Sequence, residues 1–281
     1  MRWQKTDDDY LQTLEFVAFD TETTGLWAPS NKIVEVGAVK FRLGQIDCER
    51  FQALVNPERS IPLETIRVHN ITDSMVRNAE TIRPVLEQFM EFCGPDSVLI
   101  AHNALFDISF IGCEMDRVGL SLPTNPILDT VDLARRFQPG LDSYSLLSLA
   151  QKFKISRTQN HRATDDAALV WKLFLYVSQD FPPTADATAF RRQFTFYSVD
   201  QWQGEVRPLP EEFADIQIAI DEKTRLEIVY QSNNHPPQTR VIRPFQVHSL
   251  KSNHYITAYC ERAESERTFR LDRIRSFRLL R

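Results

Sequence analysis

The sequence predicts an α/β domain followed by a second, smaller β domain. Two patterns predict this fold class. From residue 14 to about residue 178, short apolar or β-branched runs alternate with segments of helical periodicity, which is typical of a layered, mixed α/β fold. From residue 226 onwards, only short alternating segments separated by turn residues occur, and these fit a β domain of about 70 residues. With 281 residues, the chain is long enough for two domains.

Strands of the first domain are expected where an apolar run stops at polar or turn residues. Leu14 to Phe19 is apolar and stops at Asp20. Ile33 to Phe41 alternates and is rich in β-branched residues. The expected strands are 14–19, 33–41, 51–55, 98–101 and 127–133. Helical spacing of apolar residues predicts helices over 72–78 (with Thr72 as the N-cap), 82–93, 104–118, 145–153 and 163–177.

The domain boundaries follow from where periodic segments begin and end. Residues 1–13 are expected to form an N-terminal extension, 14–180 the α/β domain and 213–281 the β domain. Residues 181–212 lack clear periodicity and are rich in proline at both ends, so we expect a linker or an ordered connection there. Within the β domain, the expected strands are 226–230, 239–250, 255–261 and 268–280, with turns at Asn233-Asn234 and Ser252-Asn253.

Composition and residue spacing exclude several classes of protein. The longest apolar runs, such as 98–101, are far shorter than the ~18 residues of a membrane span, and the acidic N-terminus lacks a signal peptide's apolar stretch. The 8 glycines are too widely spaced for a GxGxxG turn or a Walker loop. The 4 cysteines form no CxxC pair, which excludes a zinc ribbon or a thioredoxin-type site. We therefore expect a cytoplasmic protein without a membrane partner.

The net charge of −5 is unevenly distributed between the two parts of the chain. Residues 213–281 carry 12 Lys and Arg against 8 Asp and Glu, whereas residues 1–212 carry 21 against 30. The two domains can therefore have different partners. The basic balance of the second part suits an anionic ligand, but a solvated basic surface is the commoner explanation.

A pair of carboxylates ends the first expected strand. Asp20 and Glu22 are two residues apart in Asp20-Thr21-Glu22-Thr23-Thr24-Gly25. Residues two apart on a strand face the same way, so the two side chains should project together. Adjacent carboxylates repel unless a cation lies between them, and hard oxygen ligands favour Mg²⁺ or Mn²⁺. The alternative is that the acidic residues only cap a loop.

Two further polar clusters lie at the starts of expected helices. Asp107 follows the buried strand 98–101 and falls in the first turn of the next helix, which the helix dipole already favours, with Asn103 as a reasonable N-cap. His161 precedes Asp166 by five residues at the start of another helix, where Thr164 or Asp165 can cap it. From these positions the imidazole and the carboxylate of Asp166 can reach one site.

Taken together, the three clusters resemble the DEDDh family of 3′→5′ exonucleases, and the epsilon proofreading subunits of bacterial DNA polymerase III among them. The resemblance covers about residues 14–178. Its motifs are Asp20 to Leu26, His102 to Asp107, and His161 with Asp166-Ala167. The segment Val68-His69-Asn70-Ile71-Thr72 is similar to the family's HGIT segment, with Asn70 in place of glycine, and Asp129-Thr130 and Ser145-Leu146 also recur in the family. The branch that uses tyrosine has it where this chain has Arg162, so the histidine branch is indicated.

The resemblance implies an RNase H-like mixed sheet and hydrolysis of phosphodiesters with two divalent cations, Mg²⁺ or Mn²⁺. The implied cation ligands are Asp20, Glu22, Asp107 and Asp166. His161 is implied as the group that takes a proton from the attacking water, a task that suits imidazole near neutral pH. The family holds the terminal nucleotide at the positions of Thr23, Leu26, His102, Asn103 and Phe106. Leu26 and Phe106 can alternatively belong to the core.

The second domain resembles a WYL domain, a small Sm/SH3-like β fold. Its best-matched part is Arg267 to Ile274, whereas His254-Tyr255-Ile256 replaces the Trp-Tyr-Leu that names the family. The resemblance implies a nucleic-acid or nucleotide-like ligand. If the last strand continues through residue 272, alternation places Arg267 and Arg273 beside an apolar stripe. The candidate ligand-binding residues are Tyr230, Arg243, Tyr255, Arg267 and Arg273, since arginine binds phosphate and tyrosine stacks on bases. The alternative is a tyrosine core with solvated arginines.

The sequence therefore predicts a metal-dependent 3′→5′ exonuclease, with DNA preferred over RNA and single-stranded 3′ ends as the expected substrate. The WYL domain would hold the nucleic acid or sense a ligand that gates the nuclease. An RNA exonuclease remains open because the motifs do not encode a contact to the 2′-OH. A non-catalytic nucleic-acid or nucleotide sensor and a proofreading subunit also remain open, as does a homodimer.

Overall fold

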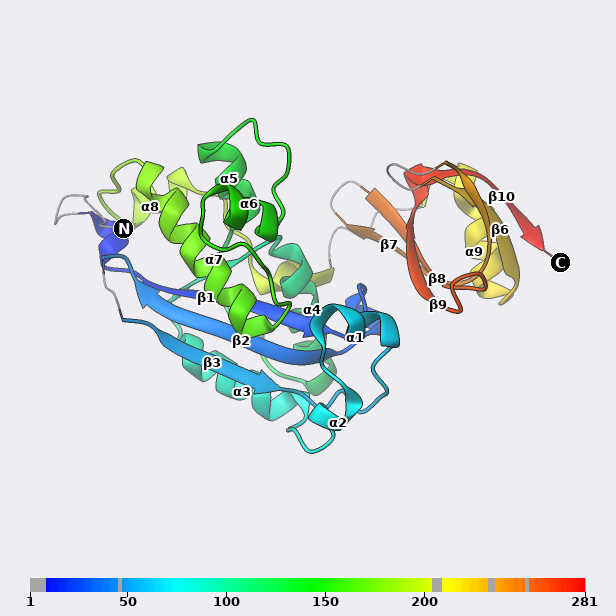
Figure 1. Cartoon of the computed structure of the whole chain (residues 1–281), viewed down its shortest axis with the longest axis horizontal. Helices are drawn as coiled ribbons and strands as arrows, with labels where there is room; N and C mark the ends of the chain where they lie inside the picture. The colour runs from blue at the N-terminus through cyan, green and yellow to red at the C-terminus, as the bar shows by residue number, and fades with distance from the viewer. Residues whose placement is uncertain (1–8, 45–46, 204–208, 232–235, 251–252, 281) are drawn as a thin grey trace. The chain divides into compact units, whose positions relative to one another are not determined.

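The structure is a computed structural model that describes residues 9–44, 47–203, 209–231, 236–250 and 253–280 (Figure 1). The chain divides into two compact units, with the boundary between Trp202 and Gln203. The first is an α/β unit and the second is dominated by a β-sheet, which confirms the predicted fold class. Within the described ranges, no helix is long and apolar enough to cross a membrane.

The first unit is built on a mixed five-stranded sheet. Its strand order is β3 (Glu49–Leu54), β2 (Ile33–Arg42), β1 (Glu15–Thr23), β4 (Val98–Ala101) and β5 (Ile127–Asp129). Strands β1, β2 and β3 are antiparallel neighbours, whereas β4 and β5 run parallel to β1. Pairing with β4 ends at Ala18, so the last residues of β1 do not pair with β4. Asp20 and Glu22 lie on this extension.

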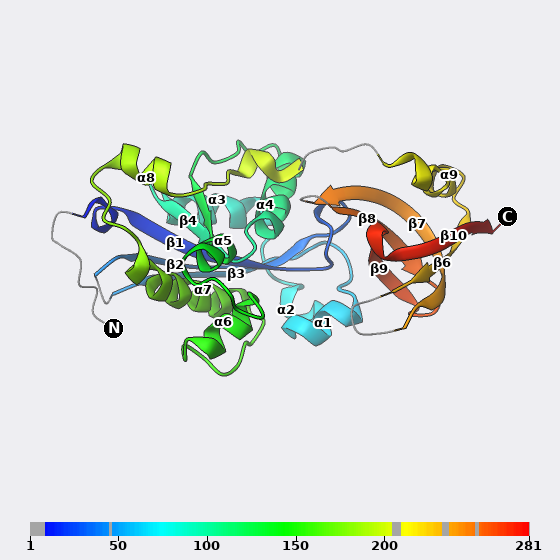
Figure 2. The ribbon, with the colours of Figure 1, turned by 90° about the horizontal axis from the view of Figure 1, so that it is seen from above.

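Helices cover both faces of the sheet, and the two views agree on this arrangement (Figures 1 and 2). On one face lie α3 (Ile82–Cys93) and α4 (Leu105–Val118); on the other lie α5 (Thr130–Phe137), α6 (Leu146–Lys152) and α7 (Ala163–Val177). Alternate residues of β1 enter the two cores: Val17 and Phe19 pack with α3 and α4, and Phe16 and Ala18 pack with α7. The even-numbered positions of β1 therefore face α7.

The predicted strand 127–133 is wrong after Asp129. The chain turns there into α5, because the carboxylate of Asp129 caps the helix by accepting the backbone N–H of Val131 at 2.8 Å. Val131, Leu133 and Ala134 form the buried side of that helix. Over such a short segment, the apolar spacing of a helix resembles the alternation of a strand.

Two short helices connect β3 to α3. Helix α1 (Leu63–His69) was not predicted, and α2 (Asp73–Val76) lies within the predicted 72–78 with Thr72 at its N-cap. Helix α1 ends at Asn70, whose φ of 58° is in the left-handed region. Asparagine tolerates that conformation better than most residues, so Asn70 can take the place of the glycine expected from the resemblance.

Residues 181–202 belong to the first unit, so of the two expected alternatives this segment is an ordered part of the chain and not a linker. Helix α8 (Ala187–Gln193) lies within it, and Phe181, Phe190 and Phe194 are buried in the core on the α7 face. The ring of Phe181 lies 4.8 Å from that of Phe137. At the other end of the unit, Leu11 is buried in the same core, so the described part of the N-terminal extension is also packed. Because these aromatic residues are irregularly spaced, the segment has no periodicity that would predict this packing.

The Phe181→Ala variant should lose about 3–5 kcal/mol of unfolding free energy, because a large buried side chain is removed from a packed cluster. Urea denaturation followed by circular dichroism would measure the change. Leu63→Ala is the control, since this side chain is 69% exposed and its removal should cost little. Equal stability of the two variants would show that residues 181–202 do not support the first unit.

The second unit is an antiparallel sheet covered by α9 (Ala214–Asp221), a helix that was not predicted. Its strand order is β10 (Ile274–Leu280), β6 (Arg225–Tyr230), β7 (Gln238–Leu250), β8 (Asn253–Cys260) and β9 (Ser265–Arg270). The predicted strand 268–280 is wrong as a single strand. Its two halves stand at opposite ends of the strand order, and a 3₁₀ turn over Leu271–Arg273 separates them. The predicted turn at Asn233-Asn234 lies outside the described residues, as does Ser252.

Candidate active site

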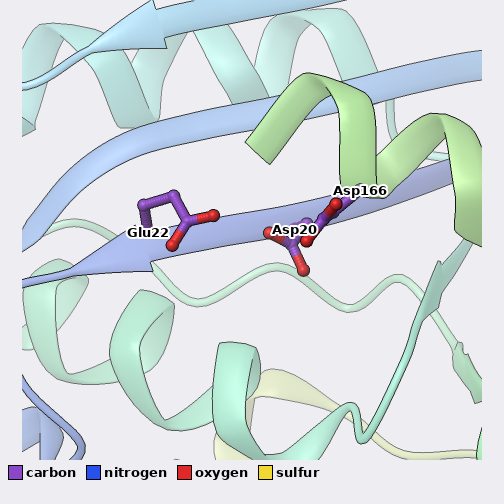
Figure 3. A group of neighbouring side chains, drawn as sticks. All are labelled: Asp20, Glu22 and Asp166. Carbon is purple, nitrogen blue, oxygen red and sulfur yellow. The ribbon is translucent and has the colours of Figure 1, made fainter. Parts of the chain in front are cut away.

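Three carboxylates meet where the end of β1 faces the start of α7 (Figure 3). Asp20, Glu22 and Asp166 each offer one oxygen, and these oxygens all lie within 4.8 Å of one another. Asp20 and Glu22 project together because both occupy even-numbered positions of β1, on the face covered by α7. The predicted pair on β1 and the predicted acid on the helix are therefore brought together.

Gly37 allows α7 to approach closely enough for this meeting. It lies opposite Asp20 in the β1–β2 register. A Cβ atom at this position would stand 2.2 Å from the backbone of Ala163 and Thr164, a distance that real Cβ atoms do not adopt. The first turn of α7 therefore rests directly on the backbone of β2, and Asp166 follows within that turn.

Asp107 reaches the same strand end from α4, on the other face. Its Oδ1 accepts hydrogen bonds from the backbone N–H of Thr21 at 2.9 Å and from the Thr21 hydroxyl at 2.8 Å. The N–H of Thr21 is available because the pairing of β1 with β4 has already ended at Ala18. This side chain is 2% exposed. All four predicted cation ligands are thus gathered at one end of β1.

Burial and mutual repulsion disfavour the ionised form of these acids. Burial, followed by repulsion from Asp107 and Glu22, raises the pKa of Asp20 well above its ordinary value. Burial and the charge of Asp166 raise the pKa of Glu22 to about 8. Burial raises the pKa of Asp107 to about 7, although its hydrogen bonds from Thr21 act in the opposite direction. Burial also raises the pKa of Asp166.

The donor set fits divalent cations with a preference for oxygen ligands. The Oδ1 atom of Asp166 is buried without a hydrogen-bond partner in the described structure, although buried polar atoms are ordinarily paired. A cation among Asp20, Glu22 and Asp166 would satisfy that atom and remove the repulsion between the carboxylates. Mg²⁺ and Mn²⁺ are the ions that such carboxylate sites favour.

His161 lies on the loop before α7, beside the carboxylates. Its Nδ1 is 3.9 Å from Oδ2 of Asp166, and 44% of its side chain is exposed to solvent. Its φ of 50° turns the backbone in the left-handed sense. Oδ2 of Asp166 also accepts a hydrogen bond from Gln159 at 2.5 Å. Sequence pattern offers no reason to select Gln159, because its role depends on how the loop folds back.

Some of the predicted nucleotide-binding residues lie beside this carboxylate group. His102 and Asn103 line an open pocket of about 640 Å³ together with Asp20, Tyr144 and Gln159. Leu26 is 70% exposed, which excludes the core interpretation for that residue. Phe106 is half-buried, with its ring 5.0 Å from that of Phe110, so it does pack against the core. The hydroxyl of Thr23 donates to the backbone carbonyl of Gly25 at 2.6 Å.

Asp129 holds the loop that carries His102 and Asn103. Its carboxylate accepts the backbone N–H groups of Asn103 at 2.9 Å and Ala104 at 3.2 Å. Asn103 has a φ of 62° and does not cap α4, contrary to the prediction, because Ala104 intervenes before the helix begins. The Nδ1 atom of His102 hydrogen-bonds to the hydroxyl of Thr130 at 2.8 Å, and burial lowers the pKa of His102 to about 4. His102 is therefore neutral at physiological pH.

In the second unit, the predicted ligand-binding residues do not form a single cluster. Tyr230 contacts the ring of Phe269 at 5.1 Å, and its hydroxyl accepts the backbone N–H of Arg270. Tyr255 lies opposite Arg270 in the β8–β9 register, so these residues share one end of the sheet. Arg243, by contrast, forms an ion pair with Glu261 at 3.2 Å and lies opposite Tyr259.

The turn at Leu271–Arg273 also corrects the predicted alternation. Arg273 does not continue the face of Arg267, because β9 ends at Arg270 and the backbone turns before residue 273. Arg267 is exposed and lies opposite Ala258. The arginine at the tyrosine end of the sheet is Arg270, whose backbone N–H donates to the hydroxyl of Tyr230 and which lies opposite Tyr255. Its guanidinium binds Asn253 and Asp272.

Comparisons with known proteins agree with this geometry. Residues 17–174 match the family model described as "Exonuclease" (RNase_T), and residues 211–279 match that of the WYL domain. The PolC-type DNA polymerase III of Listeria innocua is 40% identical over 167 residues, which is 58% of this chain and 11% of that protein. That of Clostridium perfringens is 44% identical over 153 residues, or 54% of this chain and 10% of that protein. The chain thus spans about a tenth of these curated relatives' length.

Solved structures show the same fold at low sequence identity. The nuclease domain of 3′hExo, a DEDDh family member bound to rAMP, has a TM-score of 0.55 and 16% identity, covering 68% of this chain and 98% of that one. Cell-death related nuclease 4 has a TM-score of 0.51 and 14% identity, covering 58% and 62% of the respective chains. The family match extends over more than half of the sequence and includes every acidic motif described above. This chain therefore belongs to the exonuclease family, and a WYL domain follows its exonuclease domain.

Proposed function

We propose that the protein is a metal-dependent 3′→5′ exonuclease that removes nucleotides from DNA, with single-stranded 3′ ends as its preferred substrate. The meeting of Asp20, Glu22 and Asp166 around an unpaired carboxylate oxygen is the observation that supports this function best. Asp107 completes the set at the same strand end. An open pocket large enough for a nucleotide begins at Asp20.

In this proposal, Asp20, Glu22, Asp107 and Asp166 would hold two divalent cations, Mg²⁺ or Mn²⁺. When bound, the cations supply Lewis-acid stabilisation of the negative charge that develops on the phosphate and on the leaving 3′-oxygen. His161 accepts a proton from the water whose oxygen attacks phosphorus. The new phosphorus–oxygen bond replaces the bond to the 3′-oxygen, which leaves with the bonding electrons and takes up a proton from solvent to become a hydroxyl. The products are a nucleoside 5′-monophosphate and a shortened strand.

The surroundings of the carboxylates suit the end of a nucleic-acid strand. Thr23, Leu26 and Phe106 would contact the terminal nucleotide, and His102 and Asn103 would lie against it from the pocket side. The exposure of Leu26 supports this role, because an apolar side chain in solvent beside a polar site is available to a base. Neutral His102 would add no charge of its own.

DNA is the first choice of polymer because the relatives at about 40% identity are DNA polymerases by name. An RNA substrate is the alternative, and the 3′hExo nuclease domain has rAMP bound. The site includes no assigned contact that would reject a 2′-OH. A cytoplasmic location and a homodimer remain predictions from the sequence.

We also propose that the WYL domain binds nucleic acid or a nucleotide-like ligand, through residues among Tyr230, Arg243, Tyr255, Arg267 and Arg273. Tyr230 and Tyr255 both lie next to Arg270, through a hydrogen bond from its backbone N–H and through the strand register, so the two aromatic residues share one end of the sheet and support a site there. Arg243, which is bound to Glu261, is the weakest member of the set. The domain would either hold the substrate or gate the nuclease.

A cleavage assay with the purified protein tests the nuclease proposal. Its substrates are 5′-labelled single-stranded DNA, duplex DNA and single-stranded RNA, each with a free or a blocked 3′ end, in the presence of Mg²⁺ or Mn²⁺. We expect a ladder that shortens from free 3′ ends of DNA and disappears with EDTA. Faster shortening of RNA would assign the other polymer. Cleavage of none of them would favour a sensor, or a nuclease kept inactive by its WYL domain until a ligand binds.

A further inference from the structure

A buried glutamate on β2 binds the start of α7, next to the proposed catalytic carboxylates. Glu35 is fully buried, and its Oε1 accepts hydrogen bonds from Nη2 of Arg162 at 2.5 Å and from Nε2 of Gln52 at 2.7 Å. Its Oε2 accepts Nε of Arg162 at 3.0 Å and the backbone N–H of Ala163 at 2.9 Å. Both oxygens are thus engaged by two donors each, and three of these four donors come from the beginning of α7.

The register of the sheet places this contact beside the active site. Glu35 lies opposite Glu22, and Gly37 lies opposite Asp20. The first turn of α7 therefore rests on two alternate positions of β2, with an ion pair at residue 35 and direct backbone contact at residue 37. The residues of β1 that lie opposite these two positions, Glu22 and Asp20, carry the carboxylates that Asp166 approaches.

The anchored residues lie between the two catalytic groups of this segment. Arg162 and Ala163 directly follow His161 and precede Asp166 by one helical turn. A shift of the helix start would therefore move His161 and Asp166 together. Displacements of about 1 Å in a catalytic group can lower a rate by two orders of magnitude.

The ion pair is poorly explained by stability alone. The Glu35 side chain is fully buried, whereas that of Arg162 is 29% exposed. Removing a carboxylate from water has a cost that its ion pair often does not recover. A further buried acid also opposes ionisation of the carboxylates, since the charge of Glu35 helps to raise the pKa of Glu22. Arg162 offsets that effect and acts on Glu22 in the opposite direction. Because the pair contributes little to stability and contacts the start of α7, its role is better explained as fixing the position of that helix.

We propose that Glu35 and Arg162 are positioning residues for hydrolysis, which hold the start of α7 so that Asp166 and His161 meet Asp20 and Glu22. This inference rests on the proposed exonuclease function. Neither residue is assigned a contact with substrate. Their effect is transmitted through the backbone of α7 and should appear in the turnover number and in cation affinity, with little change in KM.

The Glu35→Gln variant tests this role closely. The amide has the size of the carboxylate. In either orientation, however, its NH₂ group replaces an oxygen that accepts two hydrogen bonds and therefore faces two donors. Arg162→Lys keeps the positive charge and removes the two-point fork. Both variants leave every proposed cation ligand and His161 in place, so a loss of function that a matched control does not share arises from positioning.

Glu114→Gln serves as the matched control. Glu114 is also fully buried and is bound to two basic residues, Lys32 at 3.3 Å and Arg117 at 3.1 Å. It lies seven residues after Asp107 in α4, about 10 Å along the helix. Its substitution should destabilise the fold in a similar way without moving α7.

The full-length variants are compared in two measurements: kcat and KM on a 5′-labelled single-stranded oligonucleotide with saturating Mg²⁺, and Mn²⁺ affinity by calorimetry without substrate. Thermal unfolding verifies that each is folded at the assay temperature. We expect Glu35→Gln to lower kcat and Mn²⁺ affinity by about 10–100-fold, with nearly unchanged KM. Arg162→Lys should show a smaller loss of the same kind, and Glu114→Gln should retain both.

Native kcat and Mn²⁺ affinity in a folded Glu35→Gln variant would overturn the inference. If that variant does not fold, Arg162→Lys decides, and native values there would overturn it as well. An equal loss of kcat in Glu114→Gln would reduce the effect to general destabilisation and also overturn it. If the native protein cleaves no polymer, the exonuclease proposal loses its support or the WYL domain holds the nuclease inactive. In either case, weaker Mn²⁺ binding by Glu35→Gln would still support positioning of the carboxylates, and native Mn²⁺ binding would overturn it.

Discussion

The Asp20→Asn variant is expected to lose at least about a thousandfold of the hydrolytic rate, which corresponds to about 4 kcal/mol of transition-state stabilisation. Asp20 is the central member of the carboxylate group: it shares the site with Glu22 and Asp166, and the charge of Asp107 also acts on it. The amide nearly preserves the volume of the side chain. The loss would therefore come from weakened cation binding, with little change in packing.

The same substitution should leave the metal-free protein at least as stable as the native one. Removing one buried charge lowers the repulsion among the remaining carboxylates. Native protein should also unfold at a higher temperature in Mn²⁺ than in EDTA, and Asp20→Asn should lose most of that difference. Cleavage rates and thermal unfolding with and without Mn²⁺ measure both effects.

Asp165→Asn is the control for this experiment, because Asp165 is an exposed acid next to Asp166 and binds the side chain of Asn160. It should retain the native rate and the native response to Mn²⁺. Appreciable turnover by Asp20→Asn would contradict the assignment of the site. A large loss of the cleavage rate in Asp165→Asn as well would show that removing any nearby negative charge lowers the rate.

The His161→Asn variant is expected to lower kcat by about 10²–10⁴-fold while preserving cation binding. Asparagine removes the imidazole and tolerates the left-handed backbone that His161 adopts, so the loop should keep its course. The four carboxylates are unchanged. Stabilisation by Mn²⁺ should therefore match that of the native protein, in contrast to Asp20→Asn.

Rates on a 5′-labelled oligonucleotide and unfolding temperatures in Mn²⁺ separate these two roles. Loss of the Mn²⁺ response in His161→Asn would place His161 among the cation ligands and not at the attacking water. A native rate would remove it from the mechanism altogether. The two variants together thus distinguish holding the cation from moving the proton.

Local pattern was sufficient for the groups on β1 and for the order of the motifs. The alternation of a strand places Asp20 and Glu22 on one face whatever the rest of the chain does. The spacing of His161 and Asp166 across the start of a helix likewise depends on local geometry alone. These two facts, with Asp107 at another helix start, indicated carboxylates and an imidazole within reach of one site, and the resemblance of the three motifs to the DEDDh family implied a nuclease.

Local pattern failed where a segment's neighbours determine its structure. Ile127 to Leu133 looks like a strand until Asp129 caps a helix, and the irregular aromatic residues of 181–202 show no period although they fill a core. The predicted position of Arg273 assumed that the strand continues through residue 272, whereas the strand ends at Arg270. In each case a tertiary contact or a cap overrides the local preference.

The sequence by itself therefore determined the class of fold, the acidic motifs and the kind of chemistry, because these depend on residue types and on spacing within one element. Only the tertiary structure decided that Thr21 holds Asp107, that Gly37 admits the start of α7 and that Glu35 binds Arg162. Each of these contacts joins residues distant in the chain. Their physical basis is the register of β1 against β2 and the early end of β4, which no single segment of the sequence encodes.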